Sequence, residues 1–230
     1  MKAAATDIQL QSVATAYDRW APVYDLTFGA VFRRGRSASI AAAERIGGRI
    51  LEVGVGTGIS LPQYSVRNRI FGVDISEEML RKAQKRVTEL GLTNVEGLAV
   101  MDAEKLDFPD GAFDVVVAQY VVTAVPNPEA ALDEFARVLR PGGEIVVVTR
   151  IGAEAGLRRN IEHMLQPVVR KLGWRTEFSF ERYRRWVATR SDIRIAESRA
   201  MPPLGHFYLI RFAKLDASQT EPAQVKNAAA

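Results

Sequence analysis

Between Arg49 and Arg150, short apolar runs rich in β-branched residues alternate with longer amphipathic stretches. Short runs of this kind predict buried strands, and the longer stretches, with apolar residues every three or four positions, predict helices. The expected helices are Glu77–Leu90 and Pro128–Leu139. The expected strands are Arg49–Val53, Arg69–Asp74, Val95–Met101, Phe113–Val117 and Glu144–Thr149. This alternation predicts a parallel, doubly wound α/β sheet with right-handed crossovers.

The last third of the chain has a different pattern. Ala153–Leu172 and Arg182–Arg190 are expected to be basic helices. Ile193–Ala200 and Phe207–Lys214 are separated by a Pro-Pro-Leu-Gly segment and predict a closing antiparallel pair. Together with the five parallel strands, this pair predicts a mostly parallel, seven-stranded sheet.

The segment before the sheet is expected to form two helices, Thr6–Trp20 and Arg36–Ile46, joined through Ala21 and Pro22. Such leading helices commonly pack on a domain as a lid. We therefore expect three parts: a helical lid that also contacts the substrate and its surroundings at 1–48, the α/β domain at 49–215, and a disordered tail at 216–230.

The composition excludes several kinds of site. The 230 residues contain no Cys, which removes disulfides, thiolate metal sites and cysteine nucleophiles, and the two His residues argue against a metal site. No run approaches the roughly 20 apolar residues of a membrane-spanning helix, and the first residues lack a signal-peptide core. We therefore expect a cytoplasmic protein without a bound metal.

The positive charge is concentrated near the end of the chain. Residues 151–214 carry 13 Lys and Arg against 6 Asp and Glu, although the net charge of the whole chain is only +4. Such an imbalance predicts either a surface that meets an anionic partner or a solvated, Arg-rich helix face.

The strongest chemical signal is the loop Gly54-Val55-Gly56-Thr57-Gly58, which follows the first strand. Glycines in such a loop allow a sharp turn and a close approach of backbone to ligand. The G-x-G-x-G spacing differs from the G-x-G-x-x-G of dinucleotide sites, and no P-loop Lys follows. Glu52 lies two residues before the first glycine, where its carboxylate suits a ligand that carries an ammonium group.

Polar residues also stand at the ends of the next three strands. Asp74 can accept the two hydroxyls of a ribose, Asp102 lies where a side chain can meet an adenine edge, and Gln119 follows the fourth strand. In an open parallel sheet, ligands bind at the carboxyl ends of the strands. Four such features at one edge predict a site for an adenosine-type cofactor.

Four segments, LEVGVGTG, GVDIS, MDAEKLDFPDGAFDVVVAQ and RVLRPGGEIVVV, resemble successive motifs of class I S-adenosylmethionine-dependent methyltransferases. The resemblance implies a Rossmann-like methyltransferase fold, S-adenosylmethionine as cofactor and S-adenosylhomocysteine as product. It implies that the three loop glycines pass the methionine moiety, with Glu52 near its ammonium and Asp74 on the ribose. It also implies adenine contacts from Ile75, Met79, Asp102 and Ala103.

The flanking segments resemble a narrower group. YDRWAPVYD at 17–25 and AQYVVTAV at 118–125 are similar to segments of bacterial phospholipid N-methyltransferases, which convert phosphatidylethanolamine to phosphatidylcholine. Aromatic faces suit a methylated amine because it is cationic and a poor hydrogen-bond donor. The candidate acceptor residues are Tyr17, Trp20, Tyr24 and Tyr120, which could equally be ordinary core aromatics of the lid.

A lipid substrate implies a membrane surface. The basic last third and the amphipathic first helix could bind anionic lipid, so we expect peripheral association with the inner face of the cell membrane and no nucleic-acid partner. Tyr24 or Tyr17 could relay the proton of the amine, whereas His163 and His206 are more simply structural. Two alternatives are a quinone or small-molecule C- or O-methyltransferase, and a non-catalytic module that binds an anion through its basic face.

Overall fold

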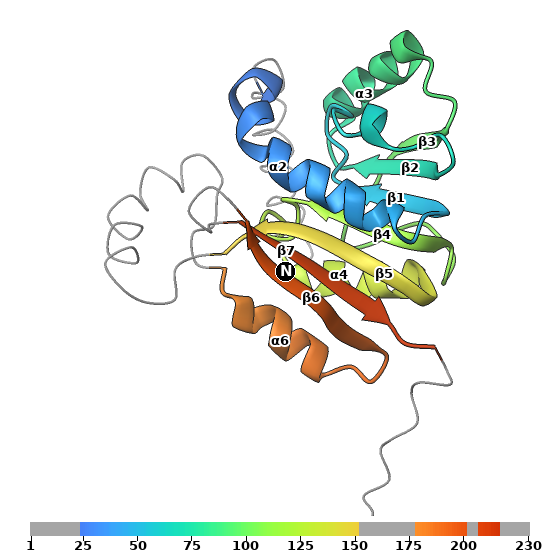
Figure 1. Ribbon diagram of the computed structural model, residues 1–230. Coiled ribbons are helices and arrows are strands. Elements are labelled where there is room, and N and C mark those ends of the chain that lie inside the picture. The colour runs from blue at the N-terminus through green and yellow to red at the C-terminus, as the bar shows by residue number, and fades with distance from the viewer. Residues whose placement is uncertain (1–23, 152–177, 202–206, 217–230) are drawn as a thin grey trace, which may run out of the picture.

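The computed structural model describes residues 24–151, 178–201 and 207–216. Its centre is a seven-stranded sheet with the order β3-β2-β1-β4-β5-β7-β6 (Figure 1). The first five strands run parallel, and β7 is antiparallel to both β5 and β6. The predicted doubly wound, mostly parallel sheet with a closing antiparallel pair is confirmed. The strands are β1 (Arg49–Val53), β2 (Arg69–Asp74), β3 (Val95–Val100), β4 (Phe113–Gln119), β5 (Leu139–Arg150), β6 (Ile193–Met201) and β7 (Phe207–Lys214).

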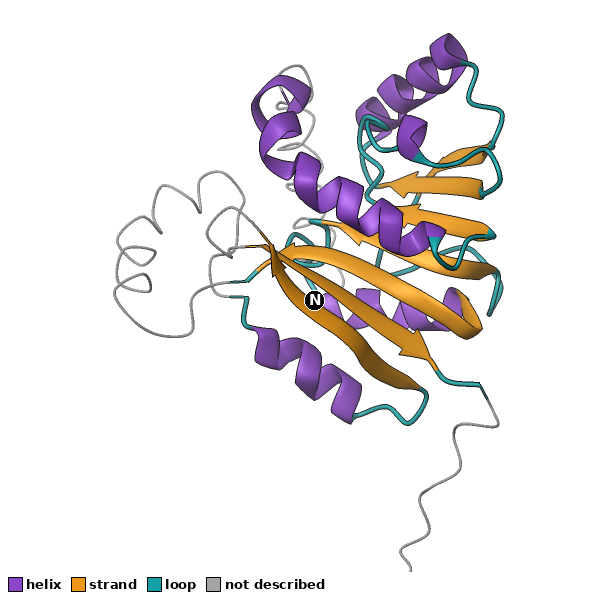
Figure 2. Ribbon diagram, viewed as in Figure 1, coloured by secondary structure: helices purple, strands orange, loops and turns teal. Residues whose placement is uncertain are grey.

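Helices cover both faces of this sheet (Figures 1 and 2). They are α2 (Tyr24–Glu44), α3 (Glu77–Leu90), α4 (Pro128–Val138) and α6 (Phe180–Ala188), with a short 3-10 helix, η1, at Leu61–Gln63. Side chains of α2 and α3 share one buried cluster with one set of strand residues, and side chains of α4 and α6 share the other cluster. Each buried strand alternates its side chains between the two clusters, as expected for a sheet that is covered on both sides.

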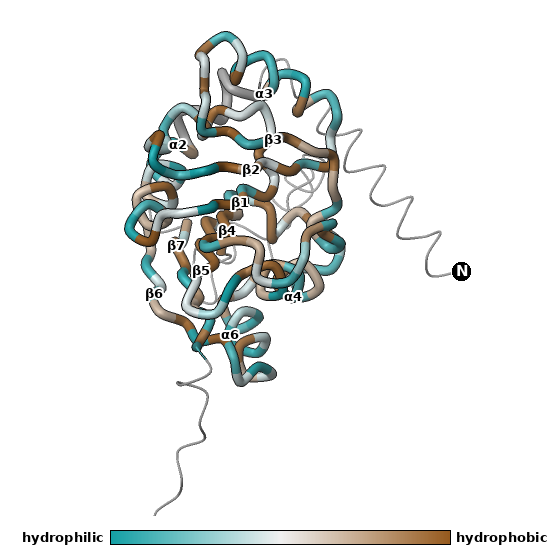
Figure 3. The backbone as a smooth tube through the Cα atoms, turned by 90° about the vertical axis from the view of Figure 1, so that its right-hand side faces the viewer, coloured by the Kyte–Doolittle hydropathy of each residue, from teal (hydrophilic) through white to brown (hydrophobic). Residues whose placement is uncertain are grey.

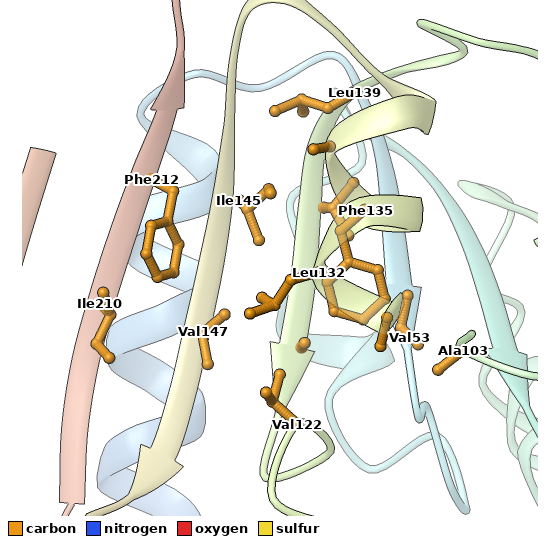
Figure 4. Packing of buried hydrophobic residues seen from close by; sticks show 14 of the residues in the cluster. Val53, Ala103, Val122, Leu132, Phe135, Leu139, Ile145, Val147, Ile210 and Phe212 are labelled. Atoms are coloured by element: carbon orange, nitrogen blue, oxygen red, sulfur yellow. The ribbon is translucent and has the colours of Figure 1, made fainter. Parts of the chain in front are cut away.

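The larger cluster joins α4 and α6 to the sheet. Leu132 and Phe135 of α4 and the strand residues Val53, Ile145 and Val147 are almost completely buried, and Figure 4 shows their side chains directed toward one another. Figure 3 shows that hydrophobic stretches follow the central strands, whereas much of the backbone of α3 is coloured hydrophilic. Burial of these apolar side chains supplies the main stabilisation of the domain.

The ends of α3 follow the local sequence. The hydroxyl of Ser76 accepts a hydrogen bond from the backbone N–H of Met79 at 3.1 Å, which is the geometry of an N-cap. Gly91 ends the helix with a left-handed φ of 58°.

The helix before the sheet begins earlier than predicted. The sequence predicted a helix at Arg36–Ile46, but α2 runs without a break from Tyr24 to Glu44. Gly29 and Gly35 weaken the local helical signal, since glycine is a poor helix former. Packing of α2 on β4 and β5 stabilises the longer helix. The expected helices Thr6–Trp20 and Ala153–Leu172 lie outside the described residues.

Candidate functional site

A cavity lies at the carboxyl ends of the parallel strands. Its walls come from the glycine loop after β1, the ends of β2 and β4, the segment after β3 and the helix α2. The sequence-predicted residues that line it are Glu52, Gly54, Gly56, Asp74, Ile75, Met79, Asp102, Ala103, Gln119 and Tyr120. Another part of the wall is formed by residues of the segment that leads into α4, namely Val121, Ala124, Val125 and Pro126. The position agrees with the general location of ligand sites in open α/β sheets.

The glycine loop is held close to β2. The backbone N–H groups of Gly54 and Val55 both donate to the carbonyl of Val73, at 2.8 and 3.0 Å. Gly54, Gly56 and Gly58 all have left-handed φ values, which residues with a Cβ rarely adopt. A Cβ on Gly56 would meet no atom of the described residues within 4 Å, so it would project into open space at the cavity wall.

Gly58 differs from the other two loop glycines. It does not line the cavity, although the family resemblance implied that it passes the methionine moiety. A Cβ at this position would lie 3.0 Å from Cβ of Ala83 and 2.9 Å from a methyl group of Leu61. Gly58 therefore allows the loop to pack closely against α3 and η1.

Asp74 ties the end of β2 to the glycine loop. Its Oδ2 accepts a hydrogen bond from the N–H of Gly56 at 2.8 Å, and its Oδ1 accepts one from the N–H of Ser76 at 2.9 Å. A carboxylate oxygen can accept more than one hydrogen bond, so both oxygens keep the capacity to accept ligand hydroxyls. Asp74 thus both shapes the loop and offers acceptors to the cavity.

Glu52 is a buried acid in the wall of the same cavity. Its Oε1 accepts a hydrogen bond from the Ser60 hydroxyl at 2.5 Å. Its Oε2 is buried and has no hydrogen-bond partner among the residues that the structure describes. Burial raises the pKa of Glu52 to about 7, against the opposing influence of Ser60, Tyr64 and Arg36. A buried carboxylate with an unsatisfied oxygen is well suited to bind a cationic ligand group.

Arg36 is a cavity residue that the sequence analysis missed. It lies on α2 and is only 7% exposed, and it is the sole Lys or Arg that lines the cavity within the described part of the chain. Nothing in the local pattern distinguishes it from the neighbouring Arg33 and Arg34, which are exposed. Only the packing of α2 on the sheet brings it to the cavity.

Tyr120 follows β4 and forms another part of the wall. Its φ of 64° makes it the one non-glycine residue with a positive φ among the described residues. The conformation is held by a hydrogen bond from its N–H to the carbonyl of Val148 at 2.7 Å and by ring contacts with Phe32 and Phe207. Gly35 of α2 makes room for it, because a Cβ there would overlap the Tyr120 hydroxyl. Sparse backbone conformations of this kind are concentrated at functional sites.

The chain matches known proteins over its core and its flanks. Residues 51–147 match a family described as "Methyltransferase domain". A phosphatidylethanolamine N-methyltransferase of Cereibacter sphaeroides is 42% identical over 207 residues, which cover 90% of this chain and all of that relative. This chain belongs to the class I S-adenosylmethionine-dependent methyltransferases. The methyltransferase is also 34% identical over 142 residues to a ubiquinone/menaquinone biosynthesis C-methyltransferase of Cupriavidus taiwanensis, which covers 60% of this chain and 56% of that relative.

Solved structures agree on the fold. The methyltransferase aligns with the YcgJ protein of Bacillus subtilis with a TM-score of 0.67 and 20% identity, over 80% of this chain and 99% of that chain. It aligns with a possible histamine N-methyltransferase of Thermotoga maritima with a TM-score of 0.64 and 22% identity, over 88% and 99%. These neighbours confirm the Rossmann-like methyltransferase fold, and the family confirms S-adenosylmethionine as the cofactor.

The cavity of this methyltransferase fits that cofactor. Besides Oε2 of Glu52, the amide Nε2 of Gln119 is buried without a hydrogen-bond partner among the described residues. Both atoms belong to residues in the cavity wall, so a polar ligand can satisfy them. The segment after β3 is itself held by hydrogen bonds, from the N–H of Glu104 to Asp102 at 2.9 Å and from the more distant Asn127 to both carboxylate oxygens of Glu104.

The positions of the other predicted acceptor residues relative to the cavity lie outside the described part of the chain. Tyr24 is the first residue of α2, but its side chain is outside the described part. Tyr17 and Trp20 precede the described residues, and His163 and His206 also fall outside them. Of the four predicted acceptor residues, Tyr120 is the one that the structure places at the cavity.

Proposed function

We propose that this methyltransferase methylates the amine of phosphatidylethanolamine and of its methylated forms, towards phosphatidylcholine, at the membrane surface. The observation that carries the proposal is the relative from Cereibacter sphaeroides, which is a phosphatidylethanolamine N-methyltransferase and aligns over its whole length. The similarity includes the flanks, where methyltransferases of one fold differ in substrate. The quinone methyltransferase match covers a smaller part of both chains and supports the alternative less well.

The strand-end residues would hold the cofactor. Glu52 would bind its ammonium, the loop at Gly54 and Gly56 would pass its methionine moiety, and Asp74 would accept the ribose hydroxyls. The adenine would lie among Ile75, Met79, Asp102, Ala103 and Gln119. When bound, S-adenosylmethionine supplies an electrophilic methyl group on a positively charged sulfur. The protein aligns the amine with that methyl group and excludes water from the cavity.

The acceptor amine would approach from the side of α2 and Tyr120. An aromatic face at this place binds a methylated amine through cation–π attraction. The ammonium head group must lose a proton before it can act as a nucleophile. Tyr24 or Tyr17 would pass that proton to water, with Trp20 lining the approach; a phenol is a weak proton acceptor near neutral pH, so this step depends on positioning.

Membrane contact would come from the amphipathic first helix expected at Thr6–Trp20 and from the basic last third. Among the described residues, no helix is long and apolar enough to cross a membrane. Part of the basic charge is paired within the domain: Arg182 binds Glu129, Arg190 binds Asp133 and Asp192, and Arg211 binds Glu144 and Glu197. The cations expected to meet anionic lipid are therefore those of the last third outside these ion pairs, among them Arg158, Arg159, Arg170, Lys171 and Arg175.

The proposal can be tested by incubating the protein with labelled S-adenosylmethionine and with several vesicle preparations, each in a separate reaction. Each vesicle carries phosphatidylethanolamine, its monomethyl form or a quinone, in either a neutral or an anionic lipid background. We expect label in the phospholipid amines, and a higher rate on the anionic vesicles that high salt reverses. Label only in the quinone would refute the proposed substrate, and equal binding to neutral and anionic vesicles would refute the electrostatic contact.

Tyr24→Phe tests the acceptor side with Tyr208→Phe as its matched control. Tyr208 is a half-buried residue of β7 that does not line the cavity. Loss of the Tyr24 hydroxyl should lower turnover on phosphatidylethanolamine while cofactor affinity stays the same, and Tyr208→Phe should change neither. Equal turnover in all three proteins would show that the Tyr24 hydroxyl does not take part in the reaction.

A further inference from the structure

We propose that Arg36 binds the carboxylate of the cofactor's methionine moiety, beside the place where Glu52 binds its ammonium. The inference rests on the family's cofactor and not on the identity of the acceptor. It makes α2 a part of the cofactor site, whereas every cofactor-binding residue predicted from the sequence lies after Arg49.

The first argument is the position of the guanidinium. Arg36 is 7% exposed and lines the cavity together with Glu52, Ser60 and the glycine loop. Burial raises the pKa of Glu52, and the positive charge of Arg36 lowers it by less than the hydrogen bonds of Ser60 and Tyr64 do. The two opposite charges therefore share one end of the cavity.

The second argument is the shape of the ligand. In an amino acid, the ammonium and the carboxylate are attached to the same carbon atom. A protein that binds the ammonium through Glu52 must therefore meet the carboxylate within a few ångströms of the same place. Arg36 is the only Lys or Arg in the described cavity wall, so it is the cation available there.

The third argument is the cost of burial. A guanidinium stays charged at any relevant pH, and a buried charge is costly unless an opposite charge lies beside it. When the ligand ammonium binds Glu52, the carboxylate of the same ligand brings a second negative charge to the end of the cavity that Arg36 lines. Arginine suits this task better than lysine because its planar fork can bind both oxygens of a carboxylate.

The position of α2 is set independently of the ligand. Its Ser37 hydroxyl donates to Oε1 of Gln63 in η1 at 3.3 Å, and Ile40 and Ala43 are buried in the cluster shared with the sheet. Ser60, which holds Glu52, directly precedes η1. Arg36 and Glu52 thus belong to segments that are packed together. This packing fixes the positions of both residues in the cavity wall before a ligand binds.

The experiment is a double-mutant cycle in which one change is made in the ligand. Calorimetry measures the affinity of the wild type and of Arg36→Met for S-adenosylhomocysteine and for its decarboxylated analogue. We expect removal of the carboxylate to weaken binding to the wild type at least tenfold. Arg36→Met should weaken binding of S-adenosylhomocysteine by a similar factor, and it should bind the two ligands within about threefold of each other.

Two further proteins serve as controls. Arg33→Met removes an exposed arginine from the same helix and should bind both ligands like the wild type. Arg36→Lys keeps the charge without the fork and should retain part of the preference for the carboxylate. The wild-type measurement with the two ligands needs no mutation, so equal binding would overturn the proposal even if Arg36→Met does not fold.

Three results would overturn the inference. Equal binding of both ligands by the wild type would show that no residue recognises the carboxylate. An equal loss for both ligands in Arg36→Met would show that Arg36 only supports Glu52 or the fold. Unchanged cofactor affinity with a raised KM for the acceptor would assign Arg36 to the phosphate of the lipid head group. Failure of the proposed acceptor would leave all of these affinities unchanged, so the two proposals fail separately.

Discussion

Because Glu52 is a buried acid, we predict that pH changes both the affinity for the cofactor and the stability of the protein. Burial raises its pKa from 4.5 to about 7 in the protein without ligand. The cofactor ammonium binds the ionised carboxylate, so a protonated Glu52 must lose its proton before the ligand can bind. Cofactor affinity should therefore fall as the pH falls through 7.

The size of the effect follows from the titration. With a pKa of about 7, the ionised fraction of Glu52 falls about tenfold between pH 8 and pH 6, and the affinity should fall by the same factor. The stability of the unliganded protein should change in the opposite direction. A raised pKa contributes stability that is fully present below pH 4.5 and is lost as the pH rises through about 7. Binding and stability should thus show opposite slopes in one pH window.

S-adenosylhomocysteine is the better ligand for this assay, because it is not turned over and has no sulfonium charge to lower the pKa of its amine. Calorimetry gives its affinity between pH 6 and pH 8, and denaturant unfolding gives the stability of the unliganded protein. Glu52→Gln is the matched variant, since its amide can keep a hydrogen bond with Ser60 but does not titrate. It should bind more weakly at pH 8 and lose both slopes. An equal affinity slope in wild type and Glu52→Gln would refute the reasoning.

Two further predictions use glycines. Gly56 and Gly91 have φ values of 55° and 58°, and a Cβ at either position meets nothing within 4 Å, so Ala should cost about 1–2 kcal/mol of stability at both. Only Gly56→Ala should also weaken cofactor binding at least tenfold by calorimetry, since only Gly56 lines the cavity; equal binding in both variants would contradict this assignment. Gly35→Ala should lower the unfolding free energy by about 1–3 kcal/mol, because its Cβ would overlap the Tyr120 hydroxyl. Tyr120→Phe in the same chain should restore part of that loss, and a purely additive double variant would show that the overlap is relieved elsewhere.

The sequence by itself determined the strands, most of the helices and the edge of the sheet at which the cofactor site lies. Strand and helix periodicities are local, so β1, β2 and β7 begin and end as predicted. Because the carboxyl ends of parallel strands meet at one edge, residues at the ends of different strands, such as Glu52, Asp74 and Gln119, could be placed in one site from the sequence alone.

The tertiary structure decided what depends on contacts between distant segments. The early start of α2, the place of Arg36 in the cavity and the fit of Gly35 to Tyr120 all follow from the packing of one helix on β4 and β5. Likewise, the sequence shows the charge surplus of the last third but not which of its cations are paired, and in the folded chain Arg182 and Arg211 bind acids from α4 and β5. No local pattern specifies such pairs, because their energy arises only when the folded chain brings together residues that are far apart in sequence.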